Sequence, residues 1–316
     1  MMRRASCRWG FRDDHEKCAD CRDPTTAGQG ACRCAVERVP GIFAAMLHGA
    51  DATDVHDMTG VRGPKQSCFV DIEKDVKRTL GMPAEGQNAL RNVLRCLSVF
   101  VPAVGYVQGM NFVCRMLLLV LDNDEEEAFW LFVGMLHRFG VRRLYCPGMP
   151  LLRLRFFQLD RLLLWHLPDL HEHFSTLEVS ADLYATSWFV TLLSDGTMLP
   201  EEEVVVLWDH LFLYSGSPSE QWGVVFRVLL EMMDRAAQRL MAIDRFGDLL
   251  QTLINLRFRD LCQEGACALL EKASRKFEGS VPMTFQLCIL YDQWEASGGA
   301  AGLGHEGQPL GLGQVS

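Results

Sequence analysis

The chain has 316 residues and a formal net charge of −9 at pH 7, and 49% of its residues are hydrophobic. This content is sufficient for a large core and excludes disorder over most of the length, while the acidic balance argues against a general nucleic-acid-binding protein, because phosphate contacts require a concentrated basic surface. No apolar run reaches the length of about 18 residues that a membrane span requires, and no apolar segment follows the N-terminal arginines as in a secretory signal, so we expect a cytoplasmic protein.

Residues 1–34 differ from the rest of the chain, because they contain five cysteines and almost no aliphatic side chains. Such a segment cannot build a core alone. It contains enough soft ligands for one tetrahedral zinc site, and the candidates are His15, Cys18, Cys21, Cys32 and Cys34. The spacing leaves two interpretations open, a weak zinc site or a disordered tail, since the second cysteine pair is one residue too close for a zinc knuckle.

From residue 36 onward, apolar residues recur at helical spacing, and no strand-like alternation of useful length occurs. Polar residues at 51–65 predict a loop, and glycine or proline marks several helix ends. The helical segments predicted in chain order are 36–50, 66–81, 89–100, 105–121, one beginning at 125, 151–167, one around Trp188, 201–214, 220–240, 248–258, 260–277 and 283–294. We therefore expect an all-α fold with a single multi-helix domain at 35–295, the Cys-rich tail at 1–34 and a Gly-rich, disordered tail at 296–316.

Two further features favour structural roles over metal binding or disulfides. The acidic residues at 125–127 follow short acceptors at 122–124, which is typical of a helix N-terminus, where negative charge meets the positive end of the helix dipole. A metal site is disfavoured because these ligands crowd one turn. Six cysteines lie in apolar helical patterns, where we expect reduced, buried thiols: Cys68, Cys96, Cys114, Cys262, Cys267 and Cys288.

Two polar motifs interrupt the apolar pattern. In the first, Ile72, Asp75 and Arg78 recur every third residue and share one face of a helix, which presents the arginine beside a carboxylate. In the second, residues 105–111 place glycines and Gln108 where a core helix would favour Leu or Ala, since glycine costs about 1 kcal/mol there. Each motif alone has an ordinary explanation, the Asp/Arg pair as an exposed salt bridge and the glutamine as a turn residue.

Together and in this order, the motifs resemble the TBC family of Rab GTPase-activating proteins over roughly residues 35–295. The resemblance is carried by I-x-x-D-x-x-R-T at 72–79, G-Y-V-Q-G-M-N at 105–111, W-F at 188–189 and L-W-D at 207–209. It implies that Arg78 and Gln108 are both supplied to the nucleotide site of a partner, and that Trp188, Trp208 and Asp209 are structural. The region 37–47 lacks the tryptophan with which the family commonly begins, so the start of the domain stays open.

The resemblance also implies the partner and the cofactors. The partner is a Rab-family small GTPase in its GTP-bound state, with no role for nucleic acid, and membranes are reached only indirectly through that GTPase, at the periphery of endomembranes. GTP and Mg²⁺ belong to the partner, so the chain is expected to have no cofactor of its own. In agreement, the sequence contains no G-x-x-x-x-G-K-[ST] phosphate-binding loop.

The residue types suit this chemistry independently of the resemblance. A planar, permanently charged guanidinium such as that of Arg78 neutralises the β,γ-phosphate oxygens, and an arginine supplied in trans is worth about 10³ to 10⁵ in rate. The carboxamide of Gln108 both donates and accepts hydrogen bonds, so it can orient the attacking water. We expect Asp75 to steer Arg78, Tyr106 to hold the glutamine loop on one side, and Gly109 to permit close approach to the partner.

Two alternative functions remain. The first is a non-catalytic module of the same fold that binds a GTPase or a trafficking complex as a scaffold. The second is a zinc-dependent adaptor that acts through residues 1–34. The presence of both Arg78 and Gln108 favours a GTPase-activating protein over the scaffold.

Overall fold

The computed structural model describes Phe43 and residues 67–296, apart from Leu80, Phe139, 215–217, Gln263 and 278–279. Every regular element in this part of the chain is a helix, which confirms the all-α fold. The helix predicted at 36–50, the loop predicted at 51–65, the tail at 1–34 and the tail at 296–316 lie outside the described residues, apart from Ala296, which is the last residue of a helix. The other exception is Phe43, which is helical and buried, with its ring centroid 5.4 Å from that of Phe129.

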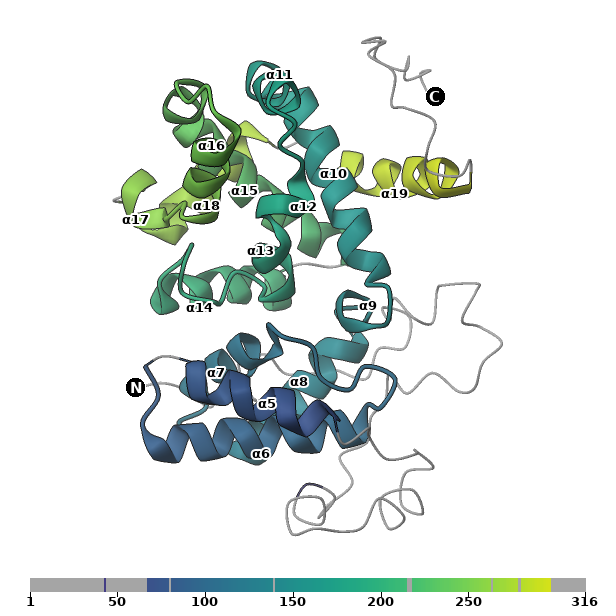
Figure 1. Cartoon of the computed structure of the whole chain (residues 1–316), viewed down its shortest axis with the longest axis vertical. Coiled ribbons are helices and arrows are strands. Elements are labelled where there is room, and N and C mark those ends of the chain that lie inside the picture. Colours follow the sequence, from purple (N-terminus) through teal and green to yellow (C-terminus); the bar gives the residue numbers. More distant parts are fainter. Residues whose placement is uncertain are drawn as a thin grey trace.

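The helices form two groups, which are separated vertically in Figure 1. The N-terminal group, at the bottom, contains α5 (Ser67–Arg78), α6 (Ala84–Phe100), α7 (Met110–Val120) and α8 (Glu125–Arg138). The short α9 (Arg142–Tyr145) connects the groups, because it contacts α8 on one side and α10 and α13 of the second group on the other.

The C-terminal group contains α10 (Pro150–His166), α11 (Pro168–Thr176), α12 (Ala181–Tyr184), α13 (Thr186–Val190), α14 (Glu201–Asp209), the π-helical turn η2 (His210–Tyr214), α15 (Pro218–Met241), α16 (Phe246–Ile254), α17 (Phe258–Leu261), α18 (Ala266–Lys276) and α19 (Ser280–Ala296). Its central helix is α15, against which α18, α19, η2 and α10 pack. The apolar stripe of α15 is buried, including Trp222, Phe226 and Met233, so its aromatic and sulfur-containing side chains form core.

The acidic stretch before α8 has the structural role that its pattern predicts. The Asp124 carboxylate accepts a hydrogen bond from the backbone N–H of Glu127 at 3.1 Å, which satisfies one of the free donors at the start of the helix. Asp122 and Asn123 adopt left-handed conformations, with φ of 52° and 63°. Short polar side chains tolerate this region best, so the residues before the helix also make the turn from α7.

Several helix boundaries differ from the sequence-based ones. α6 begins at Ala84, directly after Pro83, and not at residue 89. The segments expected at 248–258 and 260–277 are divided differently, since α16 ends at Ile254, and Gly265, with φ of 86°, separates α17 from α18. The first break is stabilised by tertiary structure, because the backbone N–H of Phe258 donates to the carbonyl of Met198 at 2.7 Å. Apolar periodicity continues across such a break and does not reveal it.

The cysteines within the described residues are free thiols. Cys96 and Cys114 are buried, and burial raises the pKa of Cys96 to about 12 and that of Cys114 higher still. Cys267 is exposed on α18, so the expectation of a buried thiol is wrong at this position. Helical spacing places a residue on an element, but a position at the margin of an apolar stripe can face solvent.

Candidate functional site

Two exposed polar side chains, Arg78 and Gln108, define the candidate site. Arg78 is the last residue of α5, and its side chain is 58% exposed. A cation at this end of a helix is favoured by the helix dipole. Gln108 lies in the loop between α6 and α7 and is exposed. The site therefore presents a guanidinium and a carboxamide to solvent from two adjacent segments of the N-terminal group.

The carboxylate of Asp75 is the ion-pair partner of Arg78. This carboxylate is only 4% exposed, and one of its oxygens, Oδ1, forms an ion pair with Nη2 of Arg78. The other oxygen, Oδ2, accepts a hydrogen bond from the Tyr106 hydroxyl at 2.6 Å. Ile72, one turn earlier on the same face, is fully buried and anchors α5 in the core. The helix face predicted from the three-residue spacing therefore carries a core residue, Ile72, then the buried carboxylate of Asp75, then the exposed Arg78.

Tyr106 links this helix to the glutamine loop. Burial and the hydrogen bond to the Asp75 carboxylate both raise the pKa of the Tyr106 hydroxyl far above its ordinary value. The raised pKa favours the protonated hydroxyl, the form that donates to Asp75. Because Gln108 follows Tyr106 by two residues, the bond between Tyr106 and Asp75 fixes the base of the loop relative to Arg78.

Asn111 and Thr79 provide a second link, which the sequence alone does not reveal. Asn111 is buried at the start of α7, and its side-chain amide donates to the Thr79 hydroxyl at 2.9 Å. Its carbonyl oxygen accepts from the backbone N–H of Gly109 at 3.0 Å and from the Tyr106 hydroxyl at 3.3 Å. Thr79 in turn donates to the backbone carbonyl of Asp75 at 2.7 Å. Thr79 and Asn111 are the last residues of the motifs at 72–79 and 105–111, but nothing in the two motifs indicates that they bond to each other.

Gly109 is required by its conformation and by its neighbour. Its φ of 111° lies in the region that favours glycine, and a Cβ atom would lie 2.4 Å from Cγ1 of Val190. Val190 is the last residue of α13, so the glutamine loop lies against the C-terminal group of helices. Sequence reasoning assigned this glycine to close approach by a partner, whereas the close contact that the structure shows is within the chain.

Val190 is fixed in turn by its own surroundings. Its carbonyl accepts a hydrogen bond from the buried Tyr145 hydroxyl at 2.7 Å. Beyond it, Leu192 and Leu193 adopt left-handed conformations, with φ of 51° and 64°. Such conformations are costly for leucine and persist only where the surroundings determine them.

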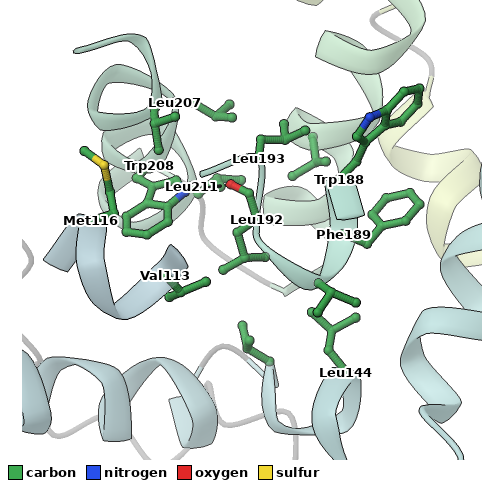
Figure 2. Packing of buried hydrophobic residues seen from close by; sticks show 14 of the residues in the cluster. Val113, Met116, Leu144, Trp188, Phe189, Leu192, Leu193, Leu207, Trp208 and Leu211 are labelled. Carbon is green, nitrogen blue, oxygen red and sulfur yellow. Dashed lines mark hydrogen bonds between the residues drawn. The ribbon is translucent and has the colours of Figure 1, made fainter. Parts of the chain in front are cut away.

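The two tryptophan motifs provide these surroundings. The indole N–H of Trp208, a fully buried residue, donates to the carbonyl of Leu192 at 3.0 Å, and the carbonyl of Trp188 accepts from the backbone N–H of Leu193 at 2.9 Å. Figure 2 shows the Trp208 ring packed between Met116 of α7 and the Leu192 segment, with Val113 nearby. Asp209 follows Trp208 as the last residue of α14 and is half-buried. The tryptophans therefore lie behind the glutamine loop, on the interior side of Val190.

The described residues contain no group of three or more His, Cys, Asp or Glu side chains placed to hold a metal ion. The zinc candidates His15, Cys18, Cys21, Cys32 and Cys34 lie outside this part of the chain. Within the same described ranges, no helix is both long enough and apolar enough to cross a bilayer.

Part of the chain matches a known domain family and several known proteins. Residues 54–241 match the model of the Rab-GTPase-TBC domain. The chain is 35% identical over 182 residues to the GTPase-activating protein GYP5 of Saccharomyces cerevisiae, a region that is 58% of this chain and 19% of that protein. It is 32% identical over 208 residues to the Rab GTPase-activating protein eat-17 of Caenorhabditis elegans, covering 64% of this chain and 22% of that protein. The chain thus spans about a fifth of the length of these relatives.

Two solved structures share the fold. The Ypt/Rab-GAP domain of Gyp1p superposes with a TM-score of 0.59 at 20% sequence identity, over 78% of this chain and 83% of that one. The Chlamydomonas flagellar RabGAP TBC domain gives a TM-score of 0.55 at 24% identity, over 80% and 73%.

Proposed function

The chain belongs to the Rab-GTPase-TBC domain family, and from this premise we propose that it accelerates GTP hydrolysis by a Rab-type small GTPase. We propose further that Arg78 and Gln108 are the catalytic residues, both supplied in trans to the nucleotide site of that partner. The observation that supports this most directly is the partly buried hydrogen bond from Tyr106 to Asp75, because it fixes the bases of two side chains whose ends face solvent.

Arg78 would act on the phosphate oxygens of the bound GTP. Charge accumulates on these oxygens in the transition state, and a guanidinium inserted from outside neutralises it. The partly exposed Arg78 is already oriented by Asp75, whose carboxylate is held on its far side by Tyr106. The Arg78 side chain then loses less rotational entropy when it enters the partner's site. More of its interaction energy therefore remains to stabilise the transition state.

Gln108 would orient the attacking water. The attacking water must be held in line with the γ-phosphorus. A carboxamide can accept one hydrogen bond from this water while it donates another. The loop supports such a role because Gly109 lies against Val190 and its N–H is bonded to Asn111, while Gln108, the residue before it, is exposed. Preorganisation of this kind reduces the entropic cost of placing the water.

The partner in this proposal is the GTP-bound form of the GTPase, which supplies the nucleotide and the Mg²⁺ ion. The chain would then need no cofactor of its own and no contact with nucleic acid. Rab-type GTPases are attached to membranes, so we place the chain in the cytoplasm, at endomembranes only through its partner, with a role in vesicle trafficking.

The test is a GTP-hydrolysis screen of the full chain against a panel of Rab-type GTPases. The expected result is acceleration of one or a few of them by wild-type protein and its loss in Arg78→Ala. Binding to a GTP-loaded member of the panel without acceleration of any would instead identify the chain as a scaffold of the same fold.

A further inference from the structure

Apart from Asn111, Arg115 is the one polar residue of the apolar helix α7. The side chain of Arg115 is only 14% exposed, and its Nη2 atom forms an ion pair with Oε1 of Glu201. Its Nε atom is buried and has no hydrogen-bond partner within the described residues. An arginine in this position loses hydration that a leucine would not need, so simple packing does not account for it.

The guanidinium of Arg115 supports the turn that follows Arg78. Gly81 lies three residues after Arg78 and has φ of 77°, and a Cβ atom added to it would lie 3.2 Å from Nη2 of Arg115. This distance is tighter than an ordinary van der Waals contact, so a side chain at Gly81 would have to displace the guanidinium. Arg115 therefore lies beside Gly81, three residues after the end of α5.

Glu201 ties the same guanidinium to the other half of the protein. It is the first residue of α14, the helix that carries Trp208, and lies in the C-terminal group. Figure 1 shows α14 as the element of that group that faces α7. Arg115 thus connects the Gly81 turn to α14, while Gly109 and Val190 connect the glutamine loop to α13. Both segments of the candidate site therefore lie near contacts to the C-terminal helices.

We propose that Arg115 is a positioning residue for Arg78. Through its ion pair with Glu201, it holds the Gly81 turn at a fixed place relative to the C-terminal helices, so that Arg78 and Gln108 keep the spacing that the partner's nucleotide requires. This inference rests on the proposed function, because it acts through Arg78. The competing explanation is that the pair only stabilises the fold, although an ion pair whose Glu201 side chain is 40% exposed contributes little to stability.

The variants that test the proposal are Arg115→Met, which keeps the volume and removes the charge, and Glu201→Gln, which keeps the shape of the partly exposed partner. The matched control is Asp234→Asn, which removes the ion pair between Asp234 and Lys276 on helices α15 and α18. Single-turnover GTP hydrolysis by the cognate GTPase is measured over a range of concentrations of each full-length variant, together with its thermal unfolding.

The expected result is a loss of about tenfold or more in the maximal rate for Arg115→Met and Glu201→Gln, because a catalytic group displaced by about 1 Å can lose about a hundredfold. The half-saturating concentration and the melting temperature should stay near wild type, and Asp234→Asn should match wild type. Arg115→Lys, which keeps the charge, should recover part of the rate. Binding to the GTPase loaded with GDP and aluminium fluoride should weaken in parallel with the rate, while binding to its form loaded with a non-hydrolysable GTP analogue should not.

Unchanged maximal rates in both Arg115→Met and Glu201→Gln, with a large loss in Arg78→Ala, would overturn the role of Arg115 and leave the proposed function intact. If the rates fall only in proportion to a lower melting temperature, the ion pair between Arg115 and Glu201 serves only to stabilise the fold. That result would also overturn the positioning role of Arg115. A full rate in Arg78→Ala would overturn both proposals. If Arg115→Met does not fold, Glu201→Gln decides the outcome, since its substituted side chain is at the surface.

Discussion

Tyr106 donates its hydroxyl hydrogen to the buried carboxylate of Asp75, with 2.6 Å between the two oxygens. This bond joins the helix that ends in Arg78 to the loop that carries Gln108. Asp75 is consequently bound on both oxygens, by a cation on the solvent side and by a phenol on the interior side. A buried carboxylate is stable only when both of its oxygens have hydrogen-bond or ion-pair partners. Because Arg78 and Tyr106 bind the same carboxylate, their positions relative to each other are fixed.

Tyr106→Phe should loosen the attachment of the Gln108 loop to α5 while the aromatic ring remains in place. The substitution leaves Oδ2 of Asp75 without its phenolic donor in a nearly buried position, which typically costs about 1 to 3 kcal/mol. We expect a lower melting temperature and a reduced maximal rate of GTPase activation, since Arg78 would lose its braced partner. Denaturant unfolding and single-turnover kinetics measure the two effects. Wild-type values in both experiments would show that the bond neither stabilises the fold nor positions the arginine.

Arg78→Ala and Arg78→Lys should remove most of the acceleration and leave the fold intact. An arginine supplied in trans is worth about 10³ to 10⁵ in rate, and lysine lacks the planar fork that contacts two oxygens at once. The loss should fall on the chemical step, because the contact is made chiefly in the transition state. Single-turnover hydrolysis at saturating protein measures this step.

The control for Arg78 is Lys77→Ala, which removes the adjacent exposed cation of α5. It should change the apparent affinity at most, because a rim charge acts mainly on association. Undiminished hydrolysis in Arg78→Ala would contradict the assignment of Arg78.

Trp208→Ala should affect stability before activity. The side chain is fully buried, and its indole N–H is bonded to the carbonyl of Leu192 in a strained left-handed conformation. Truncation of a buried tryptophan typically costs about 3 to 5 kcal/mol, so we expect a much lower melting temperature or poor solubility. Trp208→Phe should be milder than Trp208→Ala, since it keeps a six-membered aromatic ring in the core, although it loses the hydrogen bond and part of the ring volume. A variant of normal stability with selectively lost activity would reverse this interpretation.

The sequence predicted the fold class and the elements of the site because both depend on local patterns. Helical periodicity identified α15 and α10, and the three-residue spacing of Ile72, Asp75 and Arg78 correctly placed them on one helix. The short helices α9, α11 and α12 were not anticipated, because one turn or two of helix gives little periodic signal. The break between α16 and α17 also depends on a partner far along the chain, the carbonyl of Met198.

The contacts that organise the site could not be predicted, because they join residues far apart in sequence. Nothing local indicates that Asn111 bonds to Thr79, that Val190 lies against Gly109, or that Arg115 meets Glu201. The first contact requires α5 and α7 to be packed together, and the other two require the two groups of helices to be placed relative to each other. The glycine at position 109 could be recognised as a special conformation, but the atom that excludes a side chain there is visible only in the fold.

The glutamine loop gives the final prediction, which tests whether the chain itself supplies the group that positions water. If Gln108 has this role, wild-type protein should still accelerate a GTPase whose own switch glutamine has been replaced, because the missing carboxamide arrives in trans.

Gln108→Ala should be slow on the normal GTPase while still binding it, since interface energy comes from a few larger anchors and one exposed carboxamide is rarely among them. Gln108→Glu tests the same point with nearly unchanged shape, because it removes the amide donor and adds negative charge beside the phosphates. Hydrolysis rates and pull-down of the GTP-loaded partner separate chemistry from binding. Full activity of Gln108→Ala, or no response of the glutamine-less GTPase to wild-type protein, would leave Arg78 as the one residue of the pair with a direct catalytic role.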